Sequence, residues 1–99
     1  EIADRIKLPV VISSALDTGV GISHAAALAA SFEELPYACG LGTVALLESD
    51  ICEPAVLPSD GMIAVRRAEP DFALLEKYRA SDERYEWWRN RVSEVERML

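Results

Sequence analysis

The sequence is poor in basic residues, and this excludes several classes of partner. Its 17 acidic residues outnumber 10 basic ones, so the formal net charge is −7, and lysine occurs only as Lys7 and Lys77. A negatively charged chain repels phosphate groups. We therefore expect that neither a nucleic-acid backbone nor an anionic membrane surface is its partner.

Long apolar runs and clustered cysteines are also absent. Nothing approaches the roughly 18 consecutive apolar residues of a membrane span, and the first residues lack the basic-then-apolar pattern of a targeting signal. Cys39 and Cys52 are too far apart for a CxxC motif, so no zinc site is indicated and free thiols are expected. The simplest prediction is a cytoplasmic protein.

The length of 99 residues, with 51% hydrophobic and 27% charged residues, suits at most one domain with a modest core. Residues 1–7 have the pattern of the last turns of a helix without its beginning, and no initiator Met precedes them. On this ground we expect that the chain is a piece of a longer protein.

The first half of the sequence alternates between strand and helix patterns. Residues 8–14 form a short apolar run rich in β-branched side chains, which is typical of a strand buried on both faces. An alanine-rich segment, 22–32, predicts a helix, 36–41 a second strand and 43–47 a short helix. This order predicts a parallel strand pair with a right-handed crossover, and we assign 1–48 to such units.

The second half, 49–99, reads as an extension. It begins with turn-forming residues, and 62–65 could form a short edge strand. Residues 71–80 predict one helix, and a longer helix follows that Ser81 or Asp82 can cap. Apolar residues recur along this last helix at spacings of three and four, which places them on one face: Tyr85, Trp88, Val92, Val95 and Leu99.

Two parallel strands do not make a stable sheet, because parallel sheets need more strands and cover on both faces. A complete (β/α)₈ barrel typically requires about 250 residues. The pattern is therefore that of about the last quarter of such a barrel, followed by a helical tail.

Two segments, 11–21 and 37–43, carry a resemblance to a known family. The first contains Ser13-Ser14 followed by Asp17 and glycines, and the second contains Gly40-Leu41-Gly42-Thr43. Together they resemble strands seven and eight of the o-succinylbenzoate synthases, (β/α)₈ enzymes of the enolase superfamily. The similarity extends over essentially the whole chain, including Asp60-Gly61-Met62 and Trp87-Trp88-Arg89, and is greatest to members of the actinobacterial type.

The resemblance implies the C-terminal part of a lyase of menaquinone biosynthesis. This enzyme dehydrates 2-succinyl-6-hydroxy-2,4-cyclohexadiene-1-carboxylate to 2-succinylbenzoate, using a lysine base and Mg²⁺ held by three acidic residues. In the family these groups lie on strands two to six, all upstream of residue 1. Lys7 and Lys77 do not match them, so no catalytic or metal-binding residue is assigned and the chain alone is expected to be inactive.

The resemblance does assign part of the pocket that binds the small-molecule substrate. Ser13 matches a serine that donates a hydrogen bond to the succinyl carboxylate, and Gly40 matches a glycine whose backbone N–H faces that group. Ser14 and Leu41 are their neighbours in the expected substrate site. Asp17 stands where the family usually has Glu, and it could support the pocket or simply place a negative charge at a helix N-terminus.

Two alternatives remain open at this point. Enolase relatives with the same Ser-Ser turn racemise N-succinylamino acids, and only residues upstream would distinguish the two reactions. In the other alternative the chain is a non-catalytic module that associates with itself through an exposed sheet edge and the apolar face of the last helix.

Overall fold

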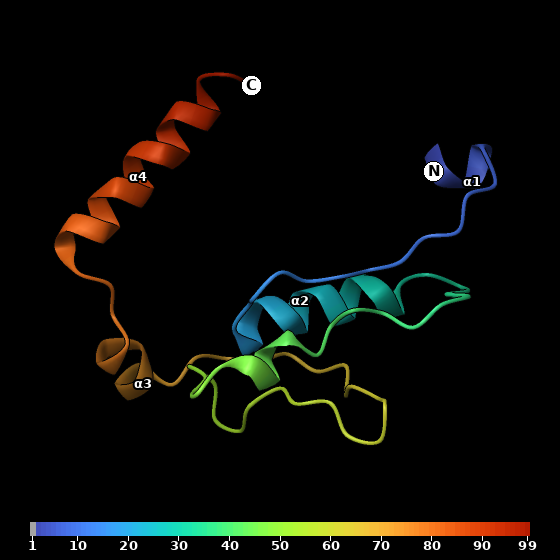
Figure 1. The fold of residues 1–99 in the computed structure, drawn as a ribbon, viewed down its shortest axis with the longest axis horizontal. Helices are drawn as coiled ribbons and strands as arrows, with labels where there is room; N and C mark the ends of the chain where they lie inside the picture. The colour runs from blue at the N-terminus through green and yellow to red at the C-terminus, as the bar shows by residue number, and fades with distance from the viewer. Residues whose placement is uncertain (1) are drawn as a thin grey trace.

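The computed structural model describes residues 2–99, and helices make up its regular structure (Figure 1). No β-sheet is formed among these residues. In chain order the elements are α1 (Ile2–Arg5), α2 (Gly19–Ala30), the 3₁₀ helix η1 (Thr43–Leu46), α3 (Phe72–Lys77) and α4 (Asp82–Glu96).

Both apolar clusters of the chain lie between residues 12 and 68, and we call this part the body. Helix α2 is at its centre, and the two segments expected to be strands run alongside the helix (Figure 1). Its alanines favour the helix and allow close approach, while Ile22, Ala26 and Ala29 recur at spacings of four and three and are buried on one face. The expected helix at 22–32 is thus confirmed, although it begins three residues earlier and ends two earlier.

Two small apolar clusters share this face of α2. The first gathers residues from both halves of the chain: Ile22, Val44, Cys52, Val56 and Ala68. The second cluster contains Ala26, Ala29 and Leu41, with Ile12 packed against it. The first cluster combines residues from both sides of position 48, so the two predicted parts, 1–48 and 49–99, do not have separate cores. The division itself stays a prediction.

The predicted strands at 8–14 and 36–41 are not formed as strands, so this part of the α/β prediction is not confirmed. They meet in a single parallel bridge between Ser13 and Gly40. The amide of Ser14 donates to the Gly40 carbonyl over 3.0 Å, and the amide of Gly40 donates to the Ile12 carbonyl over 2.9 Å. The pairing therefore has the predicted direction, but it stops after one bridge because no further strand supports it within residues 2–99.

The expected edge strand at 62–65 is wrong. Ser59 and Met62 instead bond to each other through both backbone groups and close a turn. Asp60 and Gly61 occupy this turn with φ of 51° and 74°, a conformation that glycine adopts readily. Residues 2–99 form only isolated bridges and no sheet edge, so self-association through such an edge stays a prediction.

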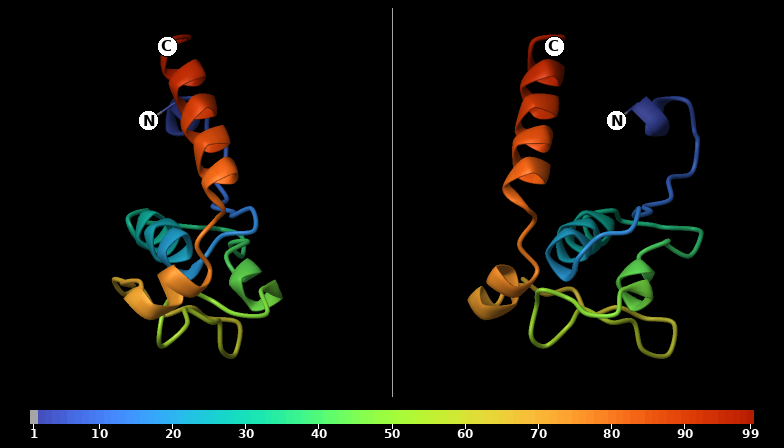
Figure 2. Two further views of the ribbon diagram at one scale, coloured as in Figure 1. Left: turned by 90° about the vertical axis from the view of Figure 1, so that its left-hand side faces the viewer. Right: turned by 60° about the vertical axis from the view of Figure 1, so that its left-hand side comes forward.

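The two helices of the extension begin at side-chain caps. Asp71 accepts hydrogen bonds from the amides of Ala73 and Leu74 at the start of α3, and Ser81 accepts one from Arg84 at the start of α4. Figure 2 shows α4 extending away from the body, and its apolar face is exposed. None of the helices in the part of the chain described here is long and apolar enough to cross a membrane.

Candidate functional site

The parallel bridge brings together the two segments that carry the expected substrate site. Ser13 is exposed, and its hydroxyl lies 3.5 Å from the Gly40 carbonyl oxygen. A Cβ added to Gly40 would lie only 2.6 Å from Ser13 Oγ, so the absence of a side chain at Gly40 is what lets the Ser13 side chain pack against it. The structure thus places Ser13 and Gly40 as direct neighbours at the surface, 27 residues apart in the chain.

A pair of half-buried hydroxyls, those of Ser14 and Thr43, lies next to this surface pair. Ser14 is half-buried, and its hydroxyl lies 3.0 Å from the Gly40 carbonyl oxygen and 2.8 Å from the Thr43 hydroxyl. Sequence reasoning quoted Thr43 only as part of a motif and gave it no role. Thr43 directly follows Gly42 and is the first residue of η1.

Leu41 and the amide of Gly40 do not have the surroundings expected of ligand-binding groups. The Leu41 side chain is only 4% exposed and packs against α2, so its contribution to the structure is to the core. The Gly40 amide already donates to the Ile12 carbonyl. Gly40 therefore contributes room for the Ser13 side chain, and the exposed hydroxyl of Ser13 is the polar group that can turn towards a ligand.

Asp17 lies beside the first turn of α2. A Cβ added to Gly21 would lie 3.1 Å from the Asp17 Cβ and 3.6 Å from its Oδ1. The side chain is half-buried and makes no hydrogen bond within the described residues. Its position suits a negative charge near a helix N-terminus, one of the two alternatives that the sequence left open.

Asp50 is a structural residue of the site region that sequence reasoning missed. Its Oδ1 accepts hydrogen bonds from the amides of Gly19, over 2.9 Å, and Ile51, over 2.8 Å. The adjacent N-cap residue Thr18 makes no such bond with its own side chain, so a carboxylate 31 residues after Gly19 caps α2 instead. No local pattern reveals a cap supplied from that distance.

The environment of Asp50 also affects Cys52. Burial raises the pKa of the Cys52 thiol, and the nearby negative charge of Asp50 raises it further, while Arg66 opposes this. Cys52 is 2% exposed, and Cys39 is half-buried. Both are free thiols, as expected from their spacing.

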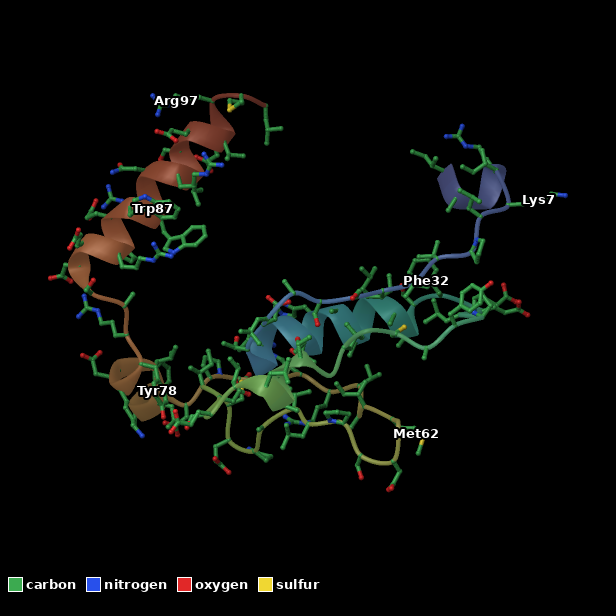
Figure 3. All side chains as sticks on the ribbon, viewed as in Figure 1. Lys7, Phe32, Met62, Tyr78, Trp87 and Arg97 are labelled. Atoms are coloured by element: carbon green, nitrogen blue, oxygen red, sulfur yellow. The ribbon has the colours of Figure 1, made fainter. Side chains whose placement is uncertain are left out.

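The described residues do not fit the magnesium site of the proposed parent enzyme. No group of three or more His, Cys, Asp or Glu side chains within residues 2–99 is placed to hold a metal ion. Lys7, which follows α1, points away from the body (Figure 3), and Lys77 belongs to α3, where its ammonium lies over the Tyr78 ring. No chemical step is therefore assigned to a metal or to a lysine of this chain.

Known proteins are similar to the chain over almost its whole length. An alignment of 92 residues with the o-succinylbenzoate synthase of Mycobacterium tuberculosis has 51% identity and covers 93% of this chain. The chain is similar to part of an o-succinylbenzoate synthase. Proteins of the same name from Mycobacterium ulcerans and Mycobacterium marinum are each 47% identical over 92 residues. No protein-family profile matches the chain.

These alignments confirm the resemblance predicted from the two motifs. Since 92 of the 99 residues align, at most seven lie outside, and both 11–21 and 37–43 fall within the aligned part. The chain spans just over a quarter, 28%, of the length of the o-succinylbenzoate synthases that it matches. The similarity is therefore to a segment of a much longer protein.

Proposed function

We propose that the chain is the C-terminal part of an o-succinylbenzoate synthase and supplies the end of the substrate pocket that binds the succinyl carboxylate. The observation that supports this most strongly is the 51% identity over 92 residues. In the parent enzyme the reaction is the magnesium-dependent loss of water that yields 2-succinylbenzoate. A cytoplasmic location is part of the same proposal.

The chemistry of Ser13 suits this role. A hydroxyl can donate one hydrogen bond to a carboxylate, and bonds with an ionised acceptor are stronger than those between neutral groups. The Ser13 hydroxyl is exposed, and its 3.5 Å contact with the Gly40 carbonyl oxygen is at the long limit for a hydrogen bond. Turning it towards a ligand would therefore cost little.

The backbone pairing supports a place for this pair at the active-site end of a barrel. In (β/α)₈ barrels the active site lies at the C-terminal ends of parallel strands. Ser13 and Gly40 are near the ends of the two segments expected to be strands seven and eight, and the one bridge that they form is parallel. In the proposed parent, neighbouring strands would extend this bridge into a ladder, and the lysine base and the metal ligands would come from the part of the relatives that this chain does not span.

The test is a hybrid enzyme in which this chain replaces the matching 92 residues of the M. tuberculosis o-succinylbenzoate synthase. We expect the hybrid to dehydrate the substrate with Mg²⁺, and the 99-residue chain alone to show no turnover. In the hybrid, Ser13→Ala should raise KM about five-fold or more, the factor for one lost hydrogen bond, with little change in melting temperature.

Ser31→Ala is the matched control for Ser13→Ala. Ser31 is also exposed and its hydroxyl bonds to a backbone carbonyl, that of Leu28 over 2.7 Å, but it lies at the other end of α2. It should leave KM unchanged. A folded hybrid without turnover would contradict the proposed function, and an unchanged KM after Ser13→Ala would remove the role of that residue.

A further inference from the structure

Hydrogen-bonded hydroxyls lead from Thr43 through Ser14 to the Gly40 carbonyl oxygen. The Gly40 carbonyl oxygen can only accept, and it lies 3.0 Å from Ser14 Oγ, so the Ser14 hydroxyl donates to it. A serine hydroxyl has a single proton. When Ser14 donates to Gly40, the Thr43 hydroxyl, 2.8 Å from Ser14 Oγ, is the donor to Ser14, an orientation that the geometry of this pair permits.

The amide and the hydroxyl of Ser14 together fill the acceptor capacity of the Gly40 carbonyl oxygen. A carbonyl oxygen has two lone pairs, and here the Ser14 amide and the Ser14 hydroxyl both donate to it over 3.0 Å. The Ser13 hydroxyl, 3.5 Å away, is the third and longest contact. Of the three hydroxyls of Ser13, Ser14 and Thr43, that of Ser13 is thus the one whose proton is not already committed to a short bond.

We infer that Thr43 is a positioning residue for the succinyl carboxylate site: by donating to Ser14 it holds the Ser14 hydroxyl on the Gly40 carbonyl and leaves the Ser13 hydroxyl free for the ligand. The inference rests on the proposed function. Thr43 itself is half-buried and its hydroxyl contacts Ser14, so in this inference it acts through Ser14 and not on the carboxylate directly.

Without the Thr43 hydroxyl, Ser14 loses the donor that fixes its rotamer. The Ser14 hydroxyl can then rotate away from the Gly40 carbonyl, which opens a lone pair on that oxygen to the exposed Ser13 hydroxyl. The proton of Ser13 would be held by the protein and not offered to an anion. The expected consequence is weaker binding of molecules that carry the succinyl arm, and of those molecules only.

The experiment uses the hybrid enzyme and two ligands, 2-succinylbenzoate and benzoate, which lacks the succinyl arm. Thr43→Val removes the hydroxyl at nearly constant volume, and Thr43→Ser restores it. Thr18→Val is the matched control, because Thr18 is also half-buried and its side chain makes no hydrogen bond within the described residues. Dissociation constants are measured by calorimetry, KM and kcat by turnover, and melting temperatures on the same samples.

We expect Thr43→Val to weaken 2-succinylbenzoate binding and raise KM by about five-fold, the factor for one ordinary hydrogen bond, with kcat and benzoate binding unchanged. Thr43→Ser and Thr18→Val should bind both ligands as the parent hybrid does. Unchanged 2-succinylbenzoate binding in Thr43→Val, or equal losses for both ligands, would overturn the inference while the parent hybrid still upholds the proposed function. A folded parent hybrid that neither turns over substrate nor binds 2-succinylbenzoate would overturn the proposed function and the inference with it.

Discussion

Removing the half-buried Asp50 carboxylate should destabilise the folded chain, because this side chain caps α2. Oδ1 of Asp50 accepts two backbone hydrogen bonds, from Gly19 at the start of α2 and from Ile51. Hydrogen bonds to charged groups contribute about 1.5–3 kcal/mol each in favourable cases, and loss of a helix cap costs about 0.5–2 kcal/mol. Both amides become unsatisfied in Asp50→Ala.

The net loss is smaller than the sum of these values. Oδ2 of Asp50 is buried without a partner among the described residues. The free-energy cost of burying this oxygen offsets part of the stabilisation that the two hydrogen bonds to Oδ1 provide. We therefore expect Asp50→Ala to lower the free energy of unfolding by about 2 kcal/mol. For a chain of this size that corresponds to a drop in melting temperature of about 10 °C.

Thermal melts followed by circular dichroism on the 99-residue chain measure this directly. Glu48→Ala is the control, because Glu48 is exposed, lies two residues away and accepts no hydrogen bond within the described residues. Asp50→Asn keeps an acceptor oxygen without the charge and should fall between the two. A melting temperature for Asp50→Ala that equals that of Glu48→Ala would refute the assigned cap.

Four further outcomes follow from the same geometry. Gly40→Ala places a Cβ against the Ser13 hydroxyl, so in the hybrid enzyme KM should rise several-fold while the melting temperature changes little. Iodoacetamide should label Cys39 before Cys52 in mass-spectrometric time courses, because Cys52 is the more buried thiol. The pKa of Cys52 in the folded state is raised above 9.0, so the unfolded state loses this proton first as the pH rises. The free energy of unfolding should therefore fall as pH rises beyond about 9. Hydrogen exchange should be fast along α4 and slow at Ile22 to Ala29, because a 15-residue helix without tertiary cover is marginal in water.

The helices could be predicted from sequence because their determinants are local. Asp71 and Ser81 cap the helices that directly follow them, and the alanine-rich segment packs through side chains spaced by three and four. Boundaries shifted by only a few residues. The start of α2 moved to Gly19 because its cap comes from Asp50, a tertiary contact that no window of adjacent residues contains.

The site could be predicted only in part, for the same reason. The motif match identified Ser13 and Gly40, and the structure makes them neighbours. The motif match did not predict that the Gly40 amide bonds to the Ile12 carbonyl, or that the Leu41 side chain is buried in the core. Both depend on the register between two segments 27 residues apart. Thr43 has a role only once that register is known.

The failed strand prediction has a different cause, which lies in how β structure is stabilised. An apolar, β-branched run predicts a strand because such residues suit a surface that neighbouring strands and helices cover. Here Leu8 is 59% exposed and Val11 48% exposed, although both belong to the run that predicts burial. A helix can satisfy its backbone within one segment, whereas a strand depends on neighbouring strands, and an isolated pair of strands is marginal in water. Each predicted strand has only the other as its neighbour within residues 2–99. The pattern of residues 8–14 is therefore typical of a strand in a sheet with more strands than residues 2–99 form. This agrees with relatives that are more than three times as long as this sequence.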